Sequence, residues 1–439
     1  MNQFKSAKAF LSYYAKWVLL SSLAGILCGG MSAGFLLLLQ ATTDLRNENN
    51  WLLYLLSIGG LIVGGIYHFF GRSVESGTNL LISEFHDPRT VVPLPMAPLV
   101  LAGTLLTQLF GGSAGREGTA VQIGGTIADQ LTHLFKLSRD ERRTLLMAGM
   151  SGGFASVFGV PVAGMIFGME ILAVGRLHAW AIVECAITAF VAHQVTLALG
   201  VHHTSYTQPE AIGLTVNSGV LAIFAGLCFG LAARIFVLLS DQISKTFKAQ
   251  FPLLPVRAFV GGAIMATIYY LLPLTTRYAG LGIPLIEDSL KTPTFIYDWV
   301  GKILFTAVTL AAGFKGGEVT PLLFIGASLG NALSTVVQLS LPMLAAMGFV
   351  AVFAGAANTP IACTIMAVEL FGPHVAIYAA LACVASYAVS GHYRIYHAQI
   401  IHLQEYSFVD RCHSFVKLLF KRPPLTEVSK PVTKISLKK

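Results

Sequence analysis

Long apolar runs alternate with short polar breaks along most of this 439-residue chain. A helix that crosses a bilayer needs about 20 apolar residues, and several runs are clearly shorter or longer than that. The segment 319–368 contains no Asp, Glu, Lys or Arg, so we expect it to break at Pro342, Gly355 and 358–360. The apolar runs lie at 17–41, 51–70, 96–110, 144–174, 179–201, 216–239, 257–274, 299–313, 320–337, 343–370 and 373–390.

Composition identifies the class of protein. Hydrophobic residues make up 55% of the chain and charged residues 11%, with a mean hydropathy of +0.70, whereas about a quarter of the residues in a soluble domain are charged. The chain is therefore expected to be an all-α integral membrane protein. Non-helical backbone persists in a membrane only where it is buried in protein or lines a cavity. The interrupted runs thus predict an interior pathway built from tilted, broken and re-entrant helices.

The net charge of +8 lies mainly in the ends and loops of the chain. Lys5, Lys8 and Lys16 precede the first apolar run, and further basic residues follow the last run, between positions 421 and 439. Because cytoplasmic segments of membrane proteins carry an excess of Lys and Arg, both termini are expected in the cytoplasm. These basic residues are interpreted as signals of membrane topology rather than as a nucleic-acid-binding surface. The six cysteines are scattered without metal-ligand spacing, and we expect no metal or cofactor.

Two glycine-rich segments, each with one glutamate, occupy equivalent positions in the two halves. The segment 112–119 (GSAGREGT) matches 313–320 (GFKGGEVT) at an offset of 201, which pairs Glu117 with Glu318. A second match at an offset of 199 pairs Glu170 with Glu369, and these two acids are expected to make structural hydrogen bonds. Such duplication is typical of transporters that bind a solute between two repeats. The predicted organisation is a cytoplasmic N-terminus at 1–16, a first membrane repeat at 17–239, a linker at 240–256, a second repeat at 257–405 and a basic tail at 406–439.

The paired breaks have the chemistry of an anion pathway. Glycines at the start of an apolar helix leave backbone N–H groups exposed, and the helix dipole adds partial positive charge. The carboxylate of Glu117 would occupy such a site when ionised and leave it when protonated, so this side chain is the predicted gate and proton carrier. An ionisable residue in a membrane-embedded run is a functional hypothesis by default. The alternative is that Glu117 only pairs with Arg116.

The same residues resemble a known family. Gly115-Arg116-Glu117-Gly118, followed by 121–125 (VQIGG), is similar to the G-R-E-G-x-x-V-Q-I-G signature of the CLC chloride channels and anion/proton antiporters. The segment 159–170 resembles that family's A-P-L-A-G-x-x-F-x-x-E helix, and the resemblance covers about residues 17–405. It implies a CLC-type inverted repeat, small inorganic anions and protons as the transported ions, and a homodimer in a lipid bilayer. A bacterial inner membrane is the expected location.

Three departures from the family pattern point in one direction. Thr119 stands where most members have proline, 317–321 (GEVTP) replaces G-x-F-x-P, and 75–79 (ESGTN) takes the place of G-S-G-I-P. These features resemble the fluoride-exporting branch, so fluoride/proton antiport is favoured. A CLC chloride channel or chloride/proton exchanger is the alternative.

The resemblance and the repeat together assign the site residues. In many members of the family a second acid accepts protons at the inner end of the helix that carries the A-P-L-A-G segment, and Ile171 stands at that position here. Glu318 is therefore the candidate second proton site. Alternatively, Glu318 shapes its loop or caps the following helix. Tyr396 is the expected tyrosine of the anion site, with Tyr393 as the alternative. The predicted anion-binding residues are Gly115, Arg116, Gly118, Thr78, Asn79, Val319, Thr320 and Tyr396.

A hydrolase is a competing class, because 111–115 (GGSAG) satisfies the G-x-S-x-G pattern of a nucleophile elbow. Ser113 lies between apolar runs, and no histidine stands in a convincing partner segment. An intramembrane serine hydrolase would also leave the repeated glycine-acid segments unexplained. This class is therefore disfavoured.

Overall fold

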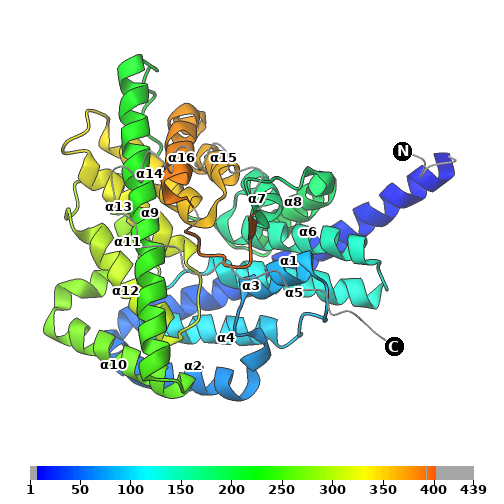
Figure 1. Ribbon diagram of the computed structural model, residues 1–439, viewed down its shortest axis with the longest axis horizontal. Helices are drawn as coiled ribbons and strands as arrows, with labels where there is room; N and C mark the ends of the chain where they lie inside the picture. Colours follow the sequence, from blue (N-terminus) through cyan, green and yellow to red (C-terminus); the bar gives the residue numbers. More distant parts are fainter. Residues whose placement is uncertain (1–6, 392, 402–439) are drawn as a thin grey trace, which may run out of the picture.

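The computed structural model describes residues 7–391 and 393–401, which form an assembly of α-helices (Figure 1). The helices are α1 Ala7–Glu48, α2 Leu56–Phe70, α3 Thr78–His86, α4 Met96–Leu109, α5 Glu117–Leu134, α6 Arg139–Phe158, α7 Pro161–Glu170, α8 Ile182–Ala198, α9 Val216–Gln250, α10 Leu254–Leu271, α11 Ile283–Ser289, α12 Asp298–Ala312, α13 Val319–Leu333, α14 Leu341–Ala357, α15 Pro360–Phe371 and α16 Ala376–Ser390. Short 3-10 turns are η1 Asn50–Leu55, η2 Arg72–Val74, η3 Ala179–Ala181, η4 Pro273–Tyr278 and η5 Pro373–Val375. Strands β1 (Ala173–Val174) and β2 (Ile400–Ile401) pair in parallel. The predicted basic tail lies outside the described residues.

Helices long enough to cross a membrane occur together with shorter apolar ones, as the interrupted runs predict. Within the described residues, six helical segments have the length and composition of a membrane span: Leu11–Glu48, Asn50–Phe70, Ala179–Ala198, Val216–Gln250, Leu254–Leu271 and Pro373–Ser390. Four further apolar helices have only 10–17 residues: Met96–Leu109, Val319–Leu333, Leu341–Ala357 and Pro360–Phe371. The prediction of an all-α membrane protein with broken helices is confirmed.

The uncharged stretch 319–368 was expected to break at three points, and the helices break at two of them. Pro342 is in the first turn of α14, and Asn358 ends that helix in a left-handed conformation with φ 57°. Gly355 was expected to break the run, but this prediction is wrong because it lies inside α14. A Cβ atom at Gly355 would come within 2.5 Å of Ser386 Oγ, so glycine permits close packing against α16 rather than a break.

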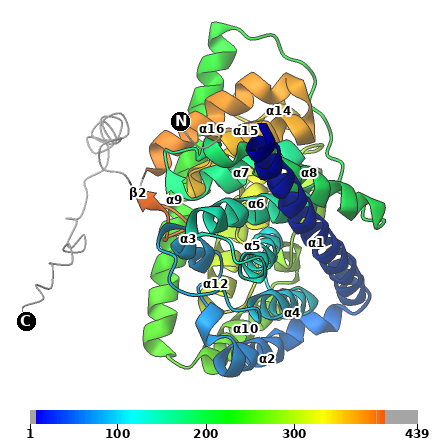
Figure 2. The same cartoon turned by 90° about the vertical axis from the view of Figure 1, so that its right-hand side faces the viewer.

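The two halves of the chain are built alike. In the first half α5 packs on α6, and in the second half α13 packs on α14. Both pairs touch backbone to backbone, because a Cβ at Gly124 would lie 2.2 Å from the carbonyl oxygen of Gly149, and one at Gly326 would lie 1.9 Å from that of Gly348. The long helix α9 packs against α12, α14 and α16, and includes residues 240–250 of the predicted linker. Helix α1 crosses α6 and α8 diagonally (Figure 2).

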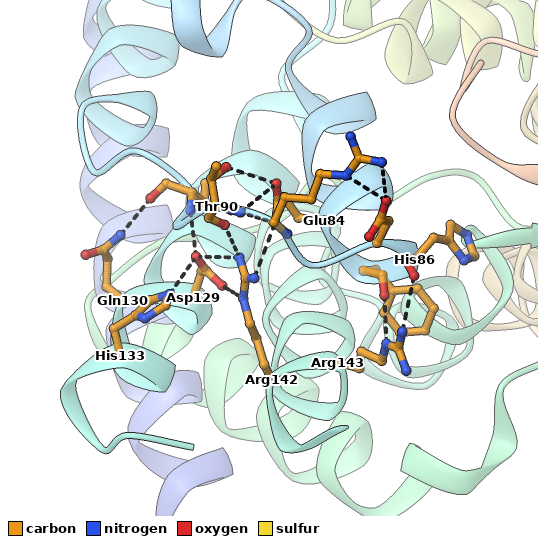
Figure 3. Close-up of polar contacts among 12 residues, drawn as sticks. Glu84, His86, Thr90, Asp129, Gln130, His133, Arg142 and Arg143 are labelled. Carbon is orange, nitrogen blue, oxygen red and sulfur yellow. Dashed lines mark hydrogen bonds and ion pairs between the residues drawn. The ribbon is translucent and has the colours of Figure 1, made fainter. Parts of the chain in front are cut away.

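A buried ion-pair network fixes the segment that joins α3 to α4 (Figure 3). Arg142 on α6 donates from Nε to Asp129 Oδ1 on α5 at 2.5 Å, and its Nη1 lies 3.2 Å from Glu84 Oε2 on α3. Its Nη2 donates to the carbonyl oxygen of Thr90 at 2.7 Å. One guanidinium therefore joins three helices and the connecting segment. The network holds the far end of α3, whose first residue is Thr78.

Candidate functional site

The two repeated glycine segments cross and bond to each other. The N–H of Gly115 donates to the carbonyl oxygen of Gly317 at 2.6 Å, and the N–H of Gly317 donates to that of Gly115 at 2.8 Å. A Cβ at Gly115 would lie 2.8 Å from Glu117 Oε2, and one at Gly317 would lie 2.8 Å from the nitrogen of Gly118. Glycine is required at these positions because the two backbones meet there. The crossing brings the N-terminal ends of α5 and α13 together.

The Glu117 carboxylate is bound at the start of the opposite repeat's helix. Its side chain is 1% exposed. Oε2 accepts the backbone N–H groups of Arg116 and Thr320, each at 3.1 Å, and Oε1 accepts the Thr320 hydroxyl at 2.5 Å. Thr320 is in the first turn of α13, where exposed N–H groups and the helix dipole favour a negative charge. A small anion would find the same donors if this carboxylate moved away.

Arg116 adds an ion pair but does not account for the position of Glu117. Arg116 Nε lies 3.7 Å from Glu117 Oε1, which is longer than a hydrogen bond. The shorter contacts to Oε1 and Oε2 come from Thr320 and from backbone N–H groups. Pairing with Arg116 alone is therefore an insufficient explanation of this buried acid.

A cavity of about 260 Å³ lies next to the crossing and is called the site cavity here. Thr78, Asn79, Gly118, Glu318 and Tyr396 all line it. Asn79 Oδ1 accepts the backbone N–H of residue 398 at 3.0 Å, which ties the start of α3 to the segment that carries Tyr396. Four segments that are far apart in the sequence thus meet around one space.

Glu318 faces the site cavity and does not cap its helix. It is the residue before α13, and its side chain makes no capping hydrogen bond. The alternative capping role is therefore wrong for this structure. The half-buried carboxylate lies instead among the lining residues of the site cavity.

The two candidate tyrosines have different surroundings. Tyr396 is 6% exposed and lines the site cavity. The ring of Tyr393 lies beneath the Arg234 guanidinium, with 4.7 Å between the guanidinium carbon and the ring centre. Of the two, Tyr396 is the one that lines the site cavity together with Glu318.

The predicted site residues thus form two adjoining groups. Gly115, Arg116, Glu117, Val319 and Thr320 surround the crossing, and Thr78, Asn79, Gly118, Glu318 and Tyr396 surround the site cavity. Sequence reasoning missed several other polar lining residues, among them Gln122, Lys315, Asp241 and His397. Gln122 follows Gly118 by one helical turn and donates to Thr78 Oγ1 at 3.4 Å, so its spacing was a usable signal. Asp241 and His397 lie in distant segments, and nothing in the sequence connects them.

Ser113 is not arranged as a nucleophile. Its hydroxyl pairs with the Thr306 hydroxyl at 3.0 Å, and its N–H donates to Thr309 Oγ1 at 3.2 Å. Both partners are threonines of α12, so these bonds fix the segment before the crossing and supply no base. Among residues 7–391 and 393–401, no group of three or more His, Cys, Asp or Glu side chains could hold a metal ion.

Comparison with known proteins adds independent evidence. A model of the voltage gated chloride channel family matches residues 59–391. The chain is 50% identical over 394 residues to a chloride/fluoride channel protein of Pseudomonas syringae pv. tomato, which covers 89% of this chain and 87% of that protein. It is also 26% identical over 378 residues to the H(+)/Cl(-) exchange transporter ClcA of Vibrio vulnificus, with 80% and 81% covered.

Solved structures match the fold over most of its length. The crystal structure of a CLC-type fluoride/proton antiporter superposes with a TM-score of 0.86 and 32% identity, covering 91% of this chain and 100% of that one. The crystal structure of a slow cyanobacterial Cl-/H+ antiporter superposes with a TM-score of 0.75, covering 85% and 94%. Its identity of 20% supports the fold alone.

Proposed function

This chain belongs to the voltage gated chloride channel family, the CLC family, and on that premise we propose that it is a fluoride/proton antiporter that exports fluoride. The observation that carries the proposal is the Glu117 carboxylate bound by the Thr320 N–H and hydroxyl. An acid in this position competes with an anion for the same donors. Exchange follows because the acid must take a proton before it leaves, and the anion can enter only after it has left.

The proposed cycle uses both groups of site residues. With Glu117 ionised, its carboxylate closes the crossing. When Glu117 is protonated, the loss of its charge weakens its bonds to the start of α13, and fluoride takes its place at the Thr320 N–H and hydroxyl. Fluoride is small and strongly hydrated, so close donors such as these and the Tyr396 hydroxyl are needed to offset the cost of removing its water.

Glu318 is the second proton site in this proposal. It adjoins the crossing through Gly317 and faces the site cavity, which also contains Asp241 and His397. A proton can therefore pass between the polar groups of the site cavity and Glu318 without crossing apolar protein. Thr78, Asn79 and Gly118 line the same space and are proposed to guide the anion.

The location and assembly of the protein are part of the same proposal. Lys and Arg near both chain ends support cytoplasmic termini, and bacterial relatives support an inner membrane. The repeats are proposed to span 17–239 and 257–405 and to work as a homodimer. Chloride transport through the same crossing is the second candidate, favoured by the chloride/fluoride designation of the Pseudomonas relative.

Purified protein in liposomes tests the proposal. Fluoride and chloride efflux would be compared under identical gradients while internal pH is recorded. We expect fluoride to leave faster than chloride and to drive protons in the opposite direction. Equal or faster chloride efflux would overturn the ion assignment, and fluoride efflux without proton movement would overturn antiport.

A further inference from the structure

The segment that carries Tyr396 is positioned by contacts with distant parts of the chain. Residues 393–399 of the described chain form neither helix nor strand. The N–H of Ile395 donates to the carbonyl oxygen of Ala356 at 3.0 Å, and the bond to Asn79 described above holds the segment on another side. Strand β2 then follows and pairs with β1. The place of Tyr396 therefore depends on these anchors and not on a helix of its own.

Gln399 anchors this segment to both halves of the chain. It is 3% exposed. Its side-chain Nε2 donates to the carbonyl oxygen of Ile171 at 2.8 Å and to that of Ala357 at 2.9 Å. Ile171 directly follows α7 in the first half, and Ala357 is the last residue of α14 in the second half. The backbone N–H of Gln399 donates to the carbonyl oxygen of Tyr396 at 3.2 Å, so a tight turn links the anchor to the tyrosine.

The chemistry of this anchor requires a primary amide. Two carbonyl oxygens face the side chain of Gln399, and a carbonyl oxygen can only accept a hydrogen bond. The amide nitrogen carries two hydrogens, one for each carbonyl, and the amide oxygen accepts from Asn358 Nδ2 at 3.4 Å. A glutamate here would turn a carboxylate toward two acceptors, and a methionine would leave both buried carbonyls without this donor. A buried polar group whose bonds are all made holds its surroundings in one arrangement.

We propose that Gln399 is a positioning residue of the anion site: it fixes where the Tyr396 hydroxyl lies in the site cavity, and through that hydroxyl it sets the preference for fluoride over chloride. The inference rests on the proposed function for the contact between Tyr396 and the anion. Coulomb energy changes most steeply at short distance. The smaller ion, fluoride, therefore loses more than chloride when the hydroxyl moves away.

A double-mutant cycle in liposomes tests this role. The ratio of fluoride to chloride efflux is measured for the unmodified protein, Gln399→Met, Tyr396→Phe and the double variant. Loss of a hydrogen bond to a charged group weakens binding about ten-fold or more, so a displaced hydroxyl in Gln399→Met should lower the ratio about three- to ten-fold. The double variant should match Tyr396→Phe within about two-fold, because phenylalanine has no hydroxyl to position and residues that act through one contact are not additive.

A milder variant keeps the test decisive if Gln399→Met yields too little folded protein. Gln399→Asn keeps the amide but is one methylene shorter, so it can reach the two carbonyls only if the segment shifts. It should lower the flux ratio less than Gln399→Met does, and it should again have no further effect when Tyr396 is replaced by phenylalanine.

The chain offers a matched control in Asn331, near the end of α13. This amide is also 3% exposed. Its Nδ2 donates to the carbonyl oxygens of Ser289 and Thr292, each at 2.8 Å, and its Oδ1 accepts the N–H of Thr294 at 3.0 Å. It does not line the site cavity. Asn331→Leu should lose thermal stability in size-exclusion chromatography to a similar degree as Gln399→Met and should keep the flux ratio of the unmodified protein.

The outcomes separate this inference from the proposed function. If Tyr396→Phe lowers the flux ratio and Gln399→Met does not, the inference fails and the proposed function stands. The inference also fails if Gln399→Met lowers the ratio by the same factor in the Tyr396→Phe protein, since Gln399 would then act on another contact. An equal change in Asn331→Leu would overturn it as a general effect of lost stability.

Two further outcomes concern the proposed function itself. If the unmodified protein prefers chloride, the fluoride assignment fails, but the same four proteins still decide whether Gln399 acts through Tyr396. If Tyr396→Phe leaves the flux ratio unchanged, the proposed anion contact and the inference both fail.

Discussion

Glu170 and Glu369 each cap the helix of the opposite repeat. The Glu170 carboxylate accepts the backbone N–H groups of the second and third residues of α15 at 3.0 and 2.8 Å. The Glu369 carboxylate accepts the equivalent groups of α7 at 2.9 and 2.8 Å. Both helices begin with proline, and neither has a capping side chain of its own. The prediction of structural hydrogen bonds at this pair is confirmed, and the reciprocal bonds join the two halves of the protein.

Removing either of these caps should reduce stability without affecting transport chemistry. In Glu369→Gln the side-chain amide nitrogen would face a backbone N–H donor. We therefore expect the free energy of unfolding to fall by about 1–3 kcal/mol. The measurement is thermal loss of the native peak in size-exclusion chromatography, with Glu170→Gln expected to behave alike. Asp288→Asn, at an exposed position on α11, is the control. Loss of proton coupling in Glu170→Gln at normal stability would instead assign it to the proton path.

The sequence predicts those parts of the fold that depend on local pattern. The break at 358–360 follows from a proline after a turn-forming Asn, and the paired sites follow from the Glu117 and Glu318 repeat. Gly355 was misread because a glycine that allows helix contact and a glycine that breaks a helix look alike in sequence. The contact between Glu117 and Thr320 could not be derived, because it depends on how two distant helix starts cross.

Arg142 should be among the least replaceable charged residues of the described chain. Arg142→Met would leave Asp129 and Glu84 buried without their cation, and breaking a buried pair by removing one partner costs about 3–5 kcal/mol. We expect Arg142→Met to lose most folded protein on detergent extraction. Arg139→Met is the control on the same helix, because Arg139 is exposed at the start of α6 and exposed charges contribute about 0–1 kcal/mol. Similar yields for both variants would contradict a stabilising role for the network.

Thr320 should determine how well the crossing holds an anion. Thr320→Val keeps the branched shape and the backbone N–H but removes the hydroxyl that now donates to Glu117. A hydrogen bond to a charged group contributes about 1.5–3 kcal/mol, so the ratio of fluoride to chloride flux in liposomes should fall roughly ten-fold or more. Thr126→Val on α5 is the control, because that hydroxyl donates to a carbonyl of its own helix. An unchanged flux ratio in Thr320→Val would place the selective contact elsewhere.

Glu117 is the residue on which the exchange mechanism depends. Its carboxylate accepts two N–H groups and one hydroxyl, and two of these donors, the Thr320 N–H and hydroxyl, are those that the proposed cycle gives to the incoming anion. Glu117→Gln has nearly the same shape but can neither ionise nor carry a proton. It should abolish proton movement driven by a fluoride gradient and slow fluoride flux, because the amide oxygen can still accept the Thr320 hydroxyl and hold the crossing closed.

The measurement is internal pH in liposomes that contain purified Glu117→Gln protein, with a fluoride gradient as the driving force. Glu369→Gln serves as the control for stability, since it should lose stability but keep coupling. A purely structural Glu117 would give the opposite result, because a neutral amide could replace it at reduced protein yield while coupled transport survived. Robust proton pumping by Glu117→Gln would refute the mechanism. Glu318, which lines the site cavity, would then be the acid to replace next.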